Sequence, residues 1–402
     1  MPTRPCWVEI RARTLEENYR FLKSLAAGQA ELLAIVKTDA YGHSLELCAP
    51  AAMRAGARWL GVTSVEEGVA ARAVCPEARI LVIGGIFAGQ GAAVVRHGLT
   101  AVAWTRPQLD ELERAARAAQ VEPGGLPVHL EIDTGMSRQG VSPDGLDRVL
   151  ERLGAGSRLR LEGVMTHLFA ADEADGAVTG EQLARLDEAL GRIEETGLYP
   201  DWLNVGNSAA LLAGQAPIIA ALAARHGMRA LLRPGLALYG LIPRFDPQFG
   251  SLESPEPPSI AAARAQLQPV LQWKTRVVSV RPVPAGAVVG YNGTFVATEP
   301  MRLALLAVGY ADGLDRRLGN RFSLLVRGAR APLVGRISMD QAVLDVTEIP
   351  GVAPGDEVVI LGTQKGSEGA ETITAFDHAQ AAGTIPWEIF TRIAARVPRI
   401  AV

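Results

Sequence analysis

The chain has 402 residues, 48% of them hydrophobic. A chain of this length is longer than a domain with a single hydrophobic core usually is, so we expect two domains. Its 40 basic and 43 acidic side chains are mixed along the sequence and give a net charge of -3. A nucleic-acid-binding protein would carry a basic stripe, so nucleic acid is excluded as an expected partner.

The cysteines and apolar runs predict a soluble protein of the cytoplasm. Cys6, Cys48 and Cys75 lack C-x-x-C spacing, which favours reduced thiols over disulfides or a zinc site, and we expect no metal. The N-terminus has no apolar signal core, and the longest apolar stretch, 209–224, is interrupted by glycine, glutamine and proline. We therefore expect no membrane partner.

The first half of the chain alternates between helix-like and strand-like segments. A capping box at Thr14 predicts the start of a first helix, and Ser64 and Thr105 carry similar signals further on. Apolar runs typical of buried parallel strands occur near 32–36, 58–63, 79–83, 100–104, 127–132, 160–166, 202–205 and 229–232. Eight such units favour a TIM-type (β/α)8 barrel over residues 11–243, although a doubly wound sheet shares this alternation.

The second half has a different character. Residues 244–268 are rich in proline, serine, glutamine and alanine, which predicts a linker. Beyond it, β-rich segments separated by glycine and proline turns predict a mostly-β domain over 269–402, with a closing helix over 384–397. The expected fold class is α/β, with an N-terminal barrel and a C-terminal mostly-β domain.

Functional side chains follow the barrel strands directly, and in a parallel barrel these strand ends meet at one rim. They are Lys37, Glu131, Arg138, His167, Asn207, Ser208 and Arg233. An amine at the end of a buried strand can form a Schiff base with an aldehyde cofactor, although most lysines in such places are simply solvated. The run into Ser208 can hold a phosphate through backbone N–H groups and a hydroxyl, or it can be a helix cap.

The run from Ala34 to His43 resembles the pyridoxal 5'-phosphate lysine signature of the alanine racemase family, A-x-x-K-x-x-A-Y-G-H. Further matches extend from about residue 8 to the C-terminus, and this resemblance decides for the barrel. It implies pyridoxal 5'-phosphate as cofactor, bound as an aldimine. It assigns to cofactor binding Lys37, Tyr41, Arg138, His167, Asn207, Ser208, Arg233, Gly235, Leu236 and Trp387.

The resemblance places Arg233 against the pyridine nitrogen of the cofactor. An arginine keeps its proton, so the ring nitrogen stays unprotonated and the ring is a weaker electron sink. Reprotonation at Cα is then favoured over transamination. A surface salt bridge would also explain an arginine, but not its Arg-Pro-Gly-Leu setting.

Racemisation needs an acid/base on each face of the substrate, and the resemblance supplies Lys37 and Tyr291. Read alone, Tyr291 is an aromatic residue of a hairpin. In the family this tyrosine has a histidine partner, matched by His167, and comes from the other subunit of a homodimer with shared active sites. The resemblance also assigns Arg138, Met339 and Asp340 to the amino-acid substrate. The entrance would be lined by Asp172, Tyr310, Arg316 and Arg336, and the strand at 6–10 would pair with the β domain.

The chain departs from the family pattern at two positions. Many members carry a carbamylated lysine where Glu131 stands, and we expect this glutamate to orient Arg138 through a charge-assisted hydrogen bond. Trp387 stands where a tyrosine is usual, and its indole can donate a hydrogen bond but cannot accept one.

The resemblance implies an alanine racemase, an isomerase that supplies D-alanine as a peptidoglycan precursor. A broad-specificity amino-acid racemase is the nearest alternative, because Trp387 alters the entrance. A barrel-type amino-acid decarboxylase shares the architecture, but usually has a carboxylate in the place of Arg233. A cofactor-carrying barrel protein without catalytic activity lacks a domain such as 270–402.

Overall fold

The computed structural model describes residues 4–173, 176–243, 245, 258–367 and 369–402. The chain divides into two compact units. The barrel unit consists of Arg13–Ala40 and Leu45–Gln268, and the β unit consists of Met1–Ala12, Tyr41–Ser44 and Pro269–Val402.

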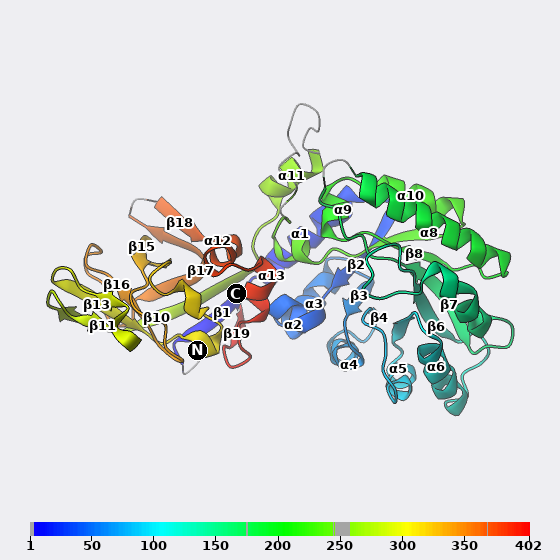
Figure 1. Ribbon diagram of the computed structural model, residues 1–402, viewed down its shortest axis with the longest axis horizontal. Helices are drawn as coiled ribbons and strands as arrows, with labels where there is room; N and C mark the ends of the chain where they lie inside the picture. The colour runs from blue at the N-terminus through cyan, green and yellow to red at the C-terminus, as the bar shows by residue number, and fades with distance from the viewer. Residues whose placement is uncertain (1–3, 174–175, 244, 246–257, 368) are drawn as a thin grey trace. The chain divides into compact units, whose positions relative to one another are not determined.

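Eight parallel strands of the barrel unit form a closed barrel in sequence order, with the last strand pairing back to the first. Their buried, largely apolar sequences fill the interior, as parallel strands covered on both faces require. The strands are β2 (Ala30–Ile35), β3 (Trp59–Val62), β4 (Arg79–Val82), β5 (Thr100–Ala103), β6 (Leu126–Glu131), β7 (Leu159–Met165), β8 (Trp202–Asn204) and β9 (Arg229–Leu232). The expected TIM-type barrel is confirmed (Figure 1).

Helices surround these strands (Figure 1). They are α1 (Ala12–Leu25), α3 (Leu45–Arg54), α4 (Val65–Val74), α5 (Gly91–Arg96), α6 (Arg106–Ala118), α7 (Leu146–Leu150), α8 (Ala177–Glu195), α9 (Ser208–Leu212) and α10 (Ala216–Arg225). Ser64 and Thr105 cap their helices as predicted. The cap predicted at Thr14 is wrong, because α1 begins at Ala12, directly after Arg11 completes the strand pairing with Val270.

The predicted linker contains a helix in its described part. Helix α11 (Pro258–Gln266) buries Ile260 and Ala263, and the Ser259 hydroxyl donates to the carbonyl of Leu212. The alanines at 261–263 favour a helix, and this preference outweighs the preceding prolines. Residues 244 and 246–257 of the expected linker lie outside the described residues.

Aromatic and charged side chains close the barrel at the end where the strands begin. Arg79 stacks on Trp59, with its guanidinium carbon 3.8 Å from the ring centroid, and Arg229 stacks on Trp202 at 3.9 Å. Glu162 is buried and accepts from Arg79 at 2.6 Å. These stacked arginines and tryptophans, together with Glu162, close this end of the barrel, and we call them the plug. The plug lies opposite the strand ends that carry the expected functional residues.

The β unit is organised by one nine-stranded sheet, in which β1 pairs antiparallel with β10 and parallel with β19. Its strands are β1 (Cys6–Ile10), β10 (Leu271–Val283), β13 (Met301–Leu306), β14 (Ser323–Val326), β15 (Ala329–Pro332), β16 (Ala342–Asp345), β17 (Glu357–Gly366), β18 (Gly369–Ile373) and β19 (Arg399–Ala401). The separate hairpin is β11 (Val288–Val289) and β12 (Phe295–Val296). The mostly-β character of this part is confirmed.

The closing helix is shorter than predicted. Helix α13 (Pro386–Thr391) follows α12 (Ala375–Ala382), and the helix expected over 384–397 stops early. The Arg399 guanidinium donates to the carbonyls of Ile393, Ala394 and Val397, so these acceptors are used by a side chain and not by a continuing helix.

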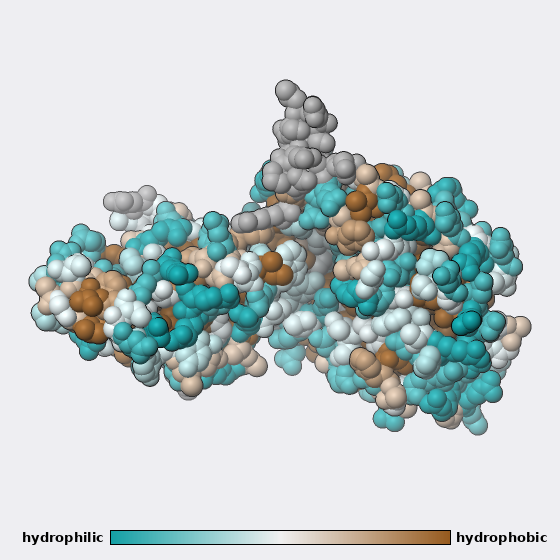
Figure 2. Space-filling model, in the orientation of Figure 1, coloured by the Kyte–Doolittle hydropathy of each residue, from teal (hydrophilic) through white to brown (hydrophobic). Residues whose placement is uncertain are grey.

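The surface is mainly hydrophilic on the face that Figure 2 shows, where hydrophobic residues appear in small separate groups. Among the described residues, none of the helices has the length and apolar character needed to cross a lipid bilayer.

Replacing Glu162 with glutamine tests the plug. Burial alone would raise the pKa of Glu162, but His129, Arg79 and Arg160 lower it from 4.5 to about 2. A depressed carboxyl pKa stabilises the fold above about pH 4.5 and ceases to do so as the pH falls towards 2. We expect Glu162→Gln to lower the free energy of unfolding by roughly 3 kcal/mol at about pH 7, and by clearly less at about pH 3.

Urea unfolding of both proteins at the two pH values, followed by circular dichroism, measures this difference. An equal loss at both pH values would show that Glu162 stabilises the barrel by packing and not by its charge.

Candidate functional site

Lys37 is the first residue of α2 (Lys37–Gly42), separated from the end of β2 by Val36 alone. The segment after Lys37 is a left-handed turn: Thr38 to Tyr41 have φ between 51° and 55°. Successive residues in this conformation are rare because each strains its Cβ against the backbone. The Thr38 N–H donates to Glu67 Oε1 at 2.6 Å, and Asp39 Oδ1 accepts from the Leu45 N–H at 2.7 Å.

The environment of Lys37 favours its neutral amine. The side chain is half-buried, and burial together with the positive charges of Arg138 and Arg233 lowers its pKa, against a smaller opposing effect of Glu67. A neutral amine is the nucleophilic form that attacks an aldehyde. Lys37 therefore has the chemistry that Schiff-base formation needs.

Arg233 directly follows β9 and is almost completely buried, with 4% of its surface exposed. Its Nη1 donates to the carbonyl and the Oδ1 of Asn204 at 2.6 and 2.7 Å, and its Nη2 donates to the Thr166 carbonyl at 2.8 Å. Burial lowers its pKa to about 10, so the guanidinium remains charged at neutral pH. The sequence did not single out Asn204 as a site residue, because a strand-end asparagine gives no signal of its partner.

His167 shares the same guanidinium. Its Nδ1 lies 3.2 Å from Arg233 Nη2, and since arginine only donates, Nδ1 must accept and the ring proton must sit on Nε2. Burial and the charges of Arg233 and Arg138 lower the pKa of His167 to about 3. His167 is therefore a neutral imidazole with an Nε2–H to donate.

Ser208 marks a place where backbone donors converge on one oxygen. Its Oγ accepts from the N–H groups of Gly235 and Ala237 at 2.9 and 3.2 Å. Asn207 caps α9 by accepting from the Ala210 N–H, which is the helix-cap role left open by the sequence. Such converging N–H groups and a hydroxyl have the chemistry that holds a phosphate oxygen.

Arg138 is exposed on a loop that Asp133 organises by accepting from two backbone N–H groups, those of Gly135 and Ser137. No hydrogen bond joins Glu131 to Arg138 within the described part of the chain. The buried Glu131 carboxyl instead accepts from Gln139 Nε2, while the side chain of Arg138 is exposed. The expected direct bond is therefore replaced by a bond to Gln139, and Arg138 acts on Glu131 only through its charge.

Tyr41 ends the left-handed turn, and burial raises its pKa to about 12, so it keeps its proton and can donate. Asp172 is half-buried in the loop after β7. Trp387 is half-buried on α13 of the β unit, and Leu236 starts a buried 3-10 turn in the barrel unit.

Tyr291 lies in the turn of the β11–β12 hairpin, with 66% of its surface exposed. Val288 and Val296 on the same hairpin are also exposed, at 63% and 48%. Gly290 has φ +74°, and an added Cβ would meet the Arg336 backbone nitrogen at 3.2 Å. The hairpin therefore packs close to the expected entrance residue Arg336 and presents its tyrosine outward.

Two further loops of the β unit are held together. The Tyr310 and Ala311 N–H groups donate to the carbonyls of Ser338 and Met339, each at 3.0 Å. This pairing places the expected residues Tyr310, Met339 and Asp340 side by side, with Arg316 following in the next 3-10 turn.

Arg396 braces these loops, a role that the sequence did not reveal. It donates to the buried Asp312 at 2.9 Å and to Asp340 at 2.6 Å, and Arg4 donates to Asp312 at 2.7 Å. These partners lie up to 308 residues apart in the chain, so no local pattern could predict them.

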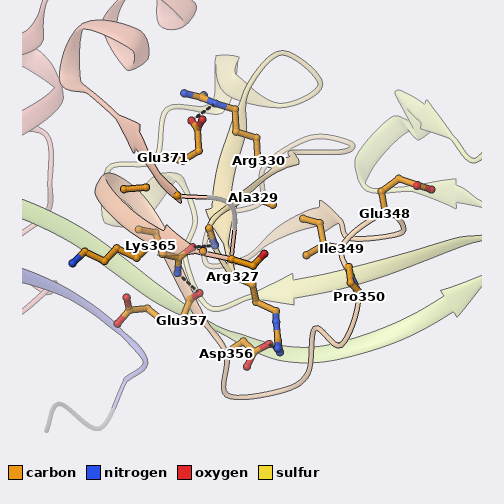
Figure 3. A pocket seen from close by; sticks show the side chains of 16 residues that line it. Arg327, Ala329, Arg330, Glu348, Ile349, Pro350, Asp356, Glu357, Lys365 and Glu371 are labelled. Carbon is orange, nitrogen blue, oxygen red and sulfur yellow. Dashed lines mark hydrogen bonds and ion pairs between the residues drawn. The ribbon is translucent and has the colours of Figure 1, made fainter.

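The β unit also contains a groove of 1190 Å³ that does not contain the expected chemistry (Figure 3). Arg330 pairs with Glu371 on its wall, and Arg327 pairs with Asp356. None of the expected site residues is among the described residues that line it. Since its charges are largely compensated by each other, we do not assign it to the active site.

The expected residues fall into two sets. The barrel unit carries a set of residues at or after the ends of its strands: Lys37, Glu131, Arg138, His167, Asp172, Asn207, Ser208, Arg233, Gly235 and Leu236. The β unit carries Tyr41, Tyr291, Tyr310, Arg316, Arg336, Met339, Asp340 and Trp387.

Comparison with known proteins is consistent with this division. Residues 10–243 match the model of the alanine racemase N-terminal domain, and residues 270–401 match that of the C-terminal domain. The chain belongs to the alanine racemase family. It is 36% identical over 401 residues to an alanine racemase of Sorangium cellulosum, with 98% of each chain covered.

Solved structures of the alanine racemase family share the fold. A crystal structure of the Bacillus anthracis enzyme with bound L-Ala-P has a TM-score of 0.85 at 31% identity, covering 100% of this chain and 96% of that one. The Bartonella henselae enzyme with covalently bound pyridoxal phosphate has a TM-score of 0.80 at 26% identity, with both chains fully covered at 100%.

Glu131→Gln should stabilise the fold while impairing the site. Burial raises the pKa of Glu131 to about 7, above its ordinary 4.5, so ionising it costs folding free energy as the pH rises from 4.5 to 7. We expect the glutamine variant to be more stable than the wild type by up to roughly 3 kcal/mol at about pH 8, with no gain at about pH 4.

Urea unfolding at both pH values measures the gain in stability, and steady-state kinetics measure the loss of substrate binding. If the negative charge of Glu131 holds Arg138 in position, the KM of the Glu131→Gln variant for substrate should rise by several fold. Unchanged turnover and substrate affinity would refute any such role for Glu131.

Proposed function

We propose that this protein is a pyridoxal 5'-phosphate-dependent alanine racemase that interconverts L-alanine and D-alanine. One observation carries the proposal. At one rim of the barrel, the amine of Lys37 has a lowered pKa and lies in the same site as the buried Arg233 and the neutral His167. Relatives solved with covalently bound pyridoxal phosphate and with L-Ala-P support the choice of cofactor and substrate.

The residues of the rim fit such a cofactor. Lys37 would hold its aldehyde carbon, and Arg233 would donate to its ring nitrogen. The phosphate would be held by the convergent donors around Ser208, helped by Tyr41. Asn207, Gly235, Leu236, His167 and Trp387 complete the proposed binding set, and Arg138 would contact both cofactor and substrate carboxylate. When bound, pyridoxal phosphate supplies an electron sink for the pair left when the substrate Cα loses its proton.

Arg233 would restrict the reaction to proton exchange. Its hydrogen bonds are all donated and its guanidinium remains charged, so it offers no proton acceptor and leaves the ring nitrogen unprotonated. By keeping that nitrogen unprotonated, Arg233 would favour reprotonation at Cα over competing reactions of the substrate. A decarboxylase of similar architecture would be better served by a carboxylate at this position.

Two bases would serve the two faces of the substrate. Lys37 would move the proton on one face, and Tyr291 would move it on the other. A phenol with an ordinary pKa of about 10 is a poor base at neutral pH. The Nε2–H of His167 can donate to a phenolate oxygen, which would stabilise the charged form of Tyr291 and improve it as a base.

We propose that the active unit is a homodimer with shared active sites. The exposure of Tyr291 and of the valines beside it supports a second copy of the chain as the partner of this hairpin. A β domain over 269–402, together with the strand at 6–10, would thus deliver Tyr291, Met339 and Asp340 to the barrel domain, 11–243, of the other copy. The proposed entrance residues are Asp172, Tyr310, Arg316 and Arg336.

We also propose that the enzyme works in the cytoplasm and supplies D-alanine for peptidoglycan. Its three cysteines are buried and none of them forms a disulfide, which suits a reducing compartment.

The direct test is conversion of L-alanine to D-alanine by the purified protein loaded with pyridoxal phosphate. Conversion that Lys37→Ala abolishes is the expected result, and no conversion by a fully loaded wild type would reject the proposal. Parallel assays with serine and lysine separate an alanine enzyme from a broad-specificity racemase. Release of carbon dioxide would identify a decarboxylase instead.

Mixing two inactive variants tests the shared site. In a hybrid dimer of Lys37→Ala and Tyr291→Phe chains, one site would receive both the intact lysine and the intact tyrosine. Random exchange makes half the dimers hybrids with one working site of two, so about a quarter of the wild-type activity should return. The rate should be measured after subunit exchange in mild denaturant, with each variant treated alone as the control. Activity no greater than the sum of the controls would place both bases on the same chain.

A further inference from the structure

Gln182 is a buried side chain of α8 that reaches the ends of two barrel strands. It is fully buried, at 0% exposure. Its Nε2 donates to Thr134 Oγ1 at 2.9 Å and to the His167 carbonyl at 3.0 Å, and its Oε1 accepts from the Phe169 N–H at 3.1 Å. Both donor positions and the acceptor oxygen are therefore used, in a residue type that is seldom buried.

Its hydrogen bonds continue as a directed chain of hydroxyls. Thr166 Oγ1 donates to the Ile132 carbonyl at 2.8 Å, so its only proton is already used. The contact of 2.8 Å between Thr134 Oγ1 and Thr166 Oγ1 must then be donated by Thr134, which in turn accepts from Gln182. The order is fixed from Gln182 through Thr134 and Thr166 to the backbone at the end of β6.

This chain of hydrogen bonds passes through Thr166, a residue that also holds the buried guanidinium. The Thr166 carbonyl accepts from Arg233 Nη2, and the next residue, His167, accepts from the same nitrogen. Gln182 binds the carbonyl of His167 and the N–H of Phe169, so it fixes the backbone on both sides of Leu168. The orientation of the imidazole thus depends on contacts made from the outer helix.

Building on the proposed racemase function, we infer that Gln182 is a positioning residue that aligns His167 and Arg233 for proton transfer at the barrel rim. An apolar side chain could fill the same space but could not tie the two strand ends to each other. A small displacement matters here, because misplacing a catalytic group by about 1 Å can cost as much as 100-fold in rate.

The removal variant is Gln182→Met, which keeps the length of the side chain but removes its hydrogen bonds. Thr134→Val breaks the same chain one link further on, and Thr134→Ser keeps the hydroxyl. The matched control is Thr179→Val: Thr179 is buried on the same helix, one turn earlier, and its hydroxyl has no hydrogen-bond partner among the described residues.

In the loaded enzyme, kcat for alanine should fall at least tenfold in Gln182→Met and Thr134→Val, with KM changed less than about twofold, because His167 and Arg233 act on the proton and the ring more than on the substrate carboxylate. Thr134→Ser and Thr179→Val should stay close to the wild type. Equal losses in the control and the removal variants, or lower thermal stability with unchanged kcat, would show a purely structural role and overturn the inference.

A second readout does not depend on activity. Nitrogen-15 NMR of histidine-labelled protein reports which ring nitrogen of His167 is protonated, with His167→Gln used to assign its signals. The wild type should show the proton on Nε2 throughout the range in which the protein is folded, and Gln182→Met should show a mixture of tautomers or titration nearer the ordinary pKa of 6.5. An unchanged His167 signal would overturn the inference, whereas a wild type without racemase activity but with a changed signal in the variant would reject only the proposed reaction.

Discussion

The buried guanidinium of Arg233 is the interaction on which the rim of the barrel depends. A charge placed out of water must be satisfied by good acceptors, and here these are backbone carbonyls and side-chain atoms at the ends of β7 and β8. Because every one of these atoms is at a strand end, the closed barrel fixes them before any ligand arrives. Through its hydrogen bond the arginine decides which ring nitrogen of His167 carries the proton. Its charge adds to the effect of burial in lowering the pKa of His167 and, to a smaller extent, that of Lys37. Burial and this charge together therefore favour the neutral forms of its neighbours.

The two ends of the barrel shift the pKa of a buried carboxyl group in opposite directions. Glu162, at the end where strands begin, has arginines in direct contact and a depressed pKa, so its charge stabilises the fold. Glu131, at the rim, lacks such a contact and has a raised pKa, so its charge is held at a cost. This contrast fits a barrel in which one end serves stability and the other serves chemistry.

Much of the barrel could be predicted because its strands are continuous apolar runs, and strand ends necessarily meet at one rim. Lys37, His167 and Arg233 were recognisable for that reason and through the family motif. The contacts that hold them were not, since Asn204 and Gln182 look like ordinary polar residues until the fold brings them to their partners. The helix α11 was not predicted because the prolines and serines just before it dominate the local composition, although Ile260 and Ala263 are buried in the structure. The bond from Gln139 to Glu131 depends on side-chain reach, which spacing alone does not determine.

The left-handed turn after Lys37 has a consequence for the order of assembly. Four consecutive residues with side chains, Thr38 to Tyr41, adopt a conformation that costs roughly 1–2 kcal/mol each, so the segment has no reason to form in an isolated peptide. Its anchors, Glu67 and the Leu45 N–H, exist in the right place only when the neighbouring strands and helices are in position. The amine consequently acquires its final direction late, after the scaffold has closed, and a nascent chain does not present a finished cofactor site.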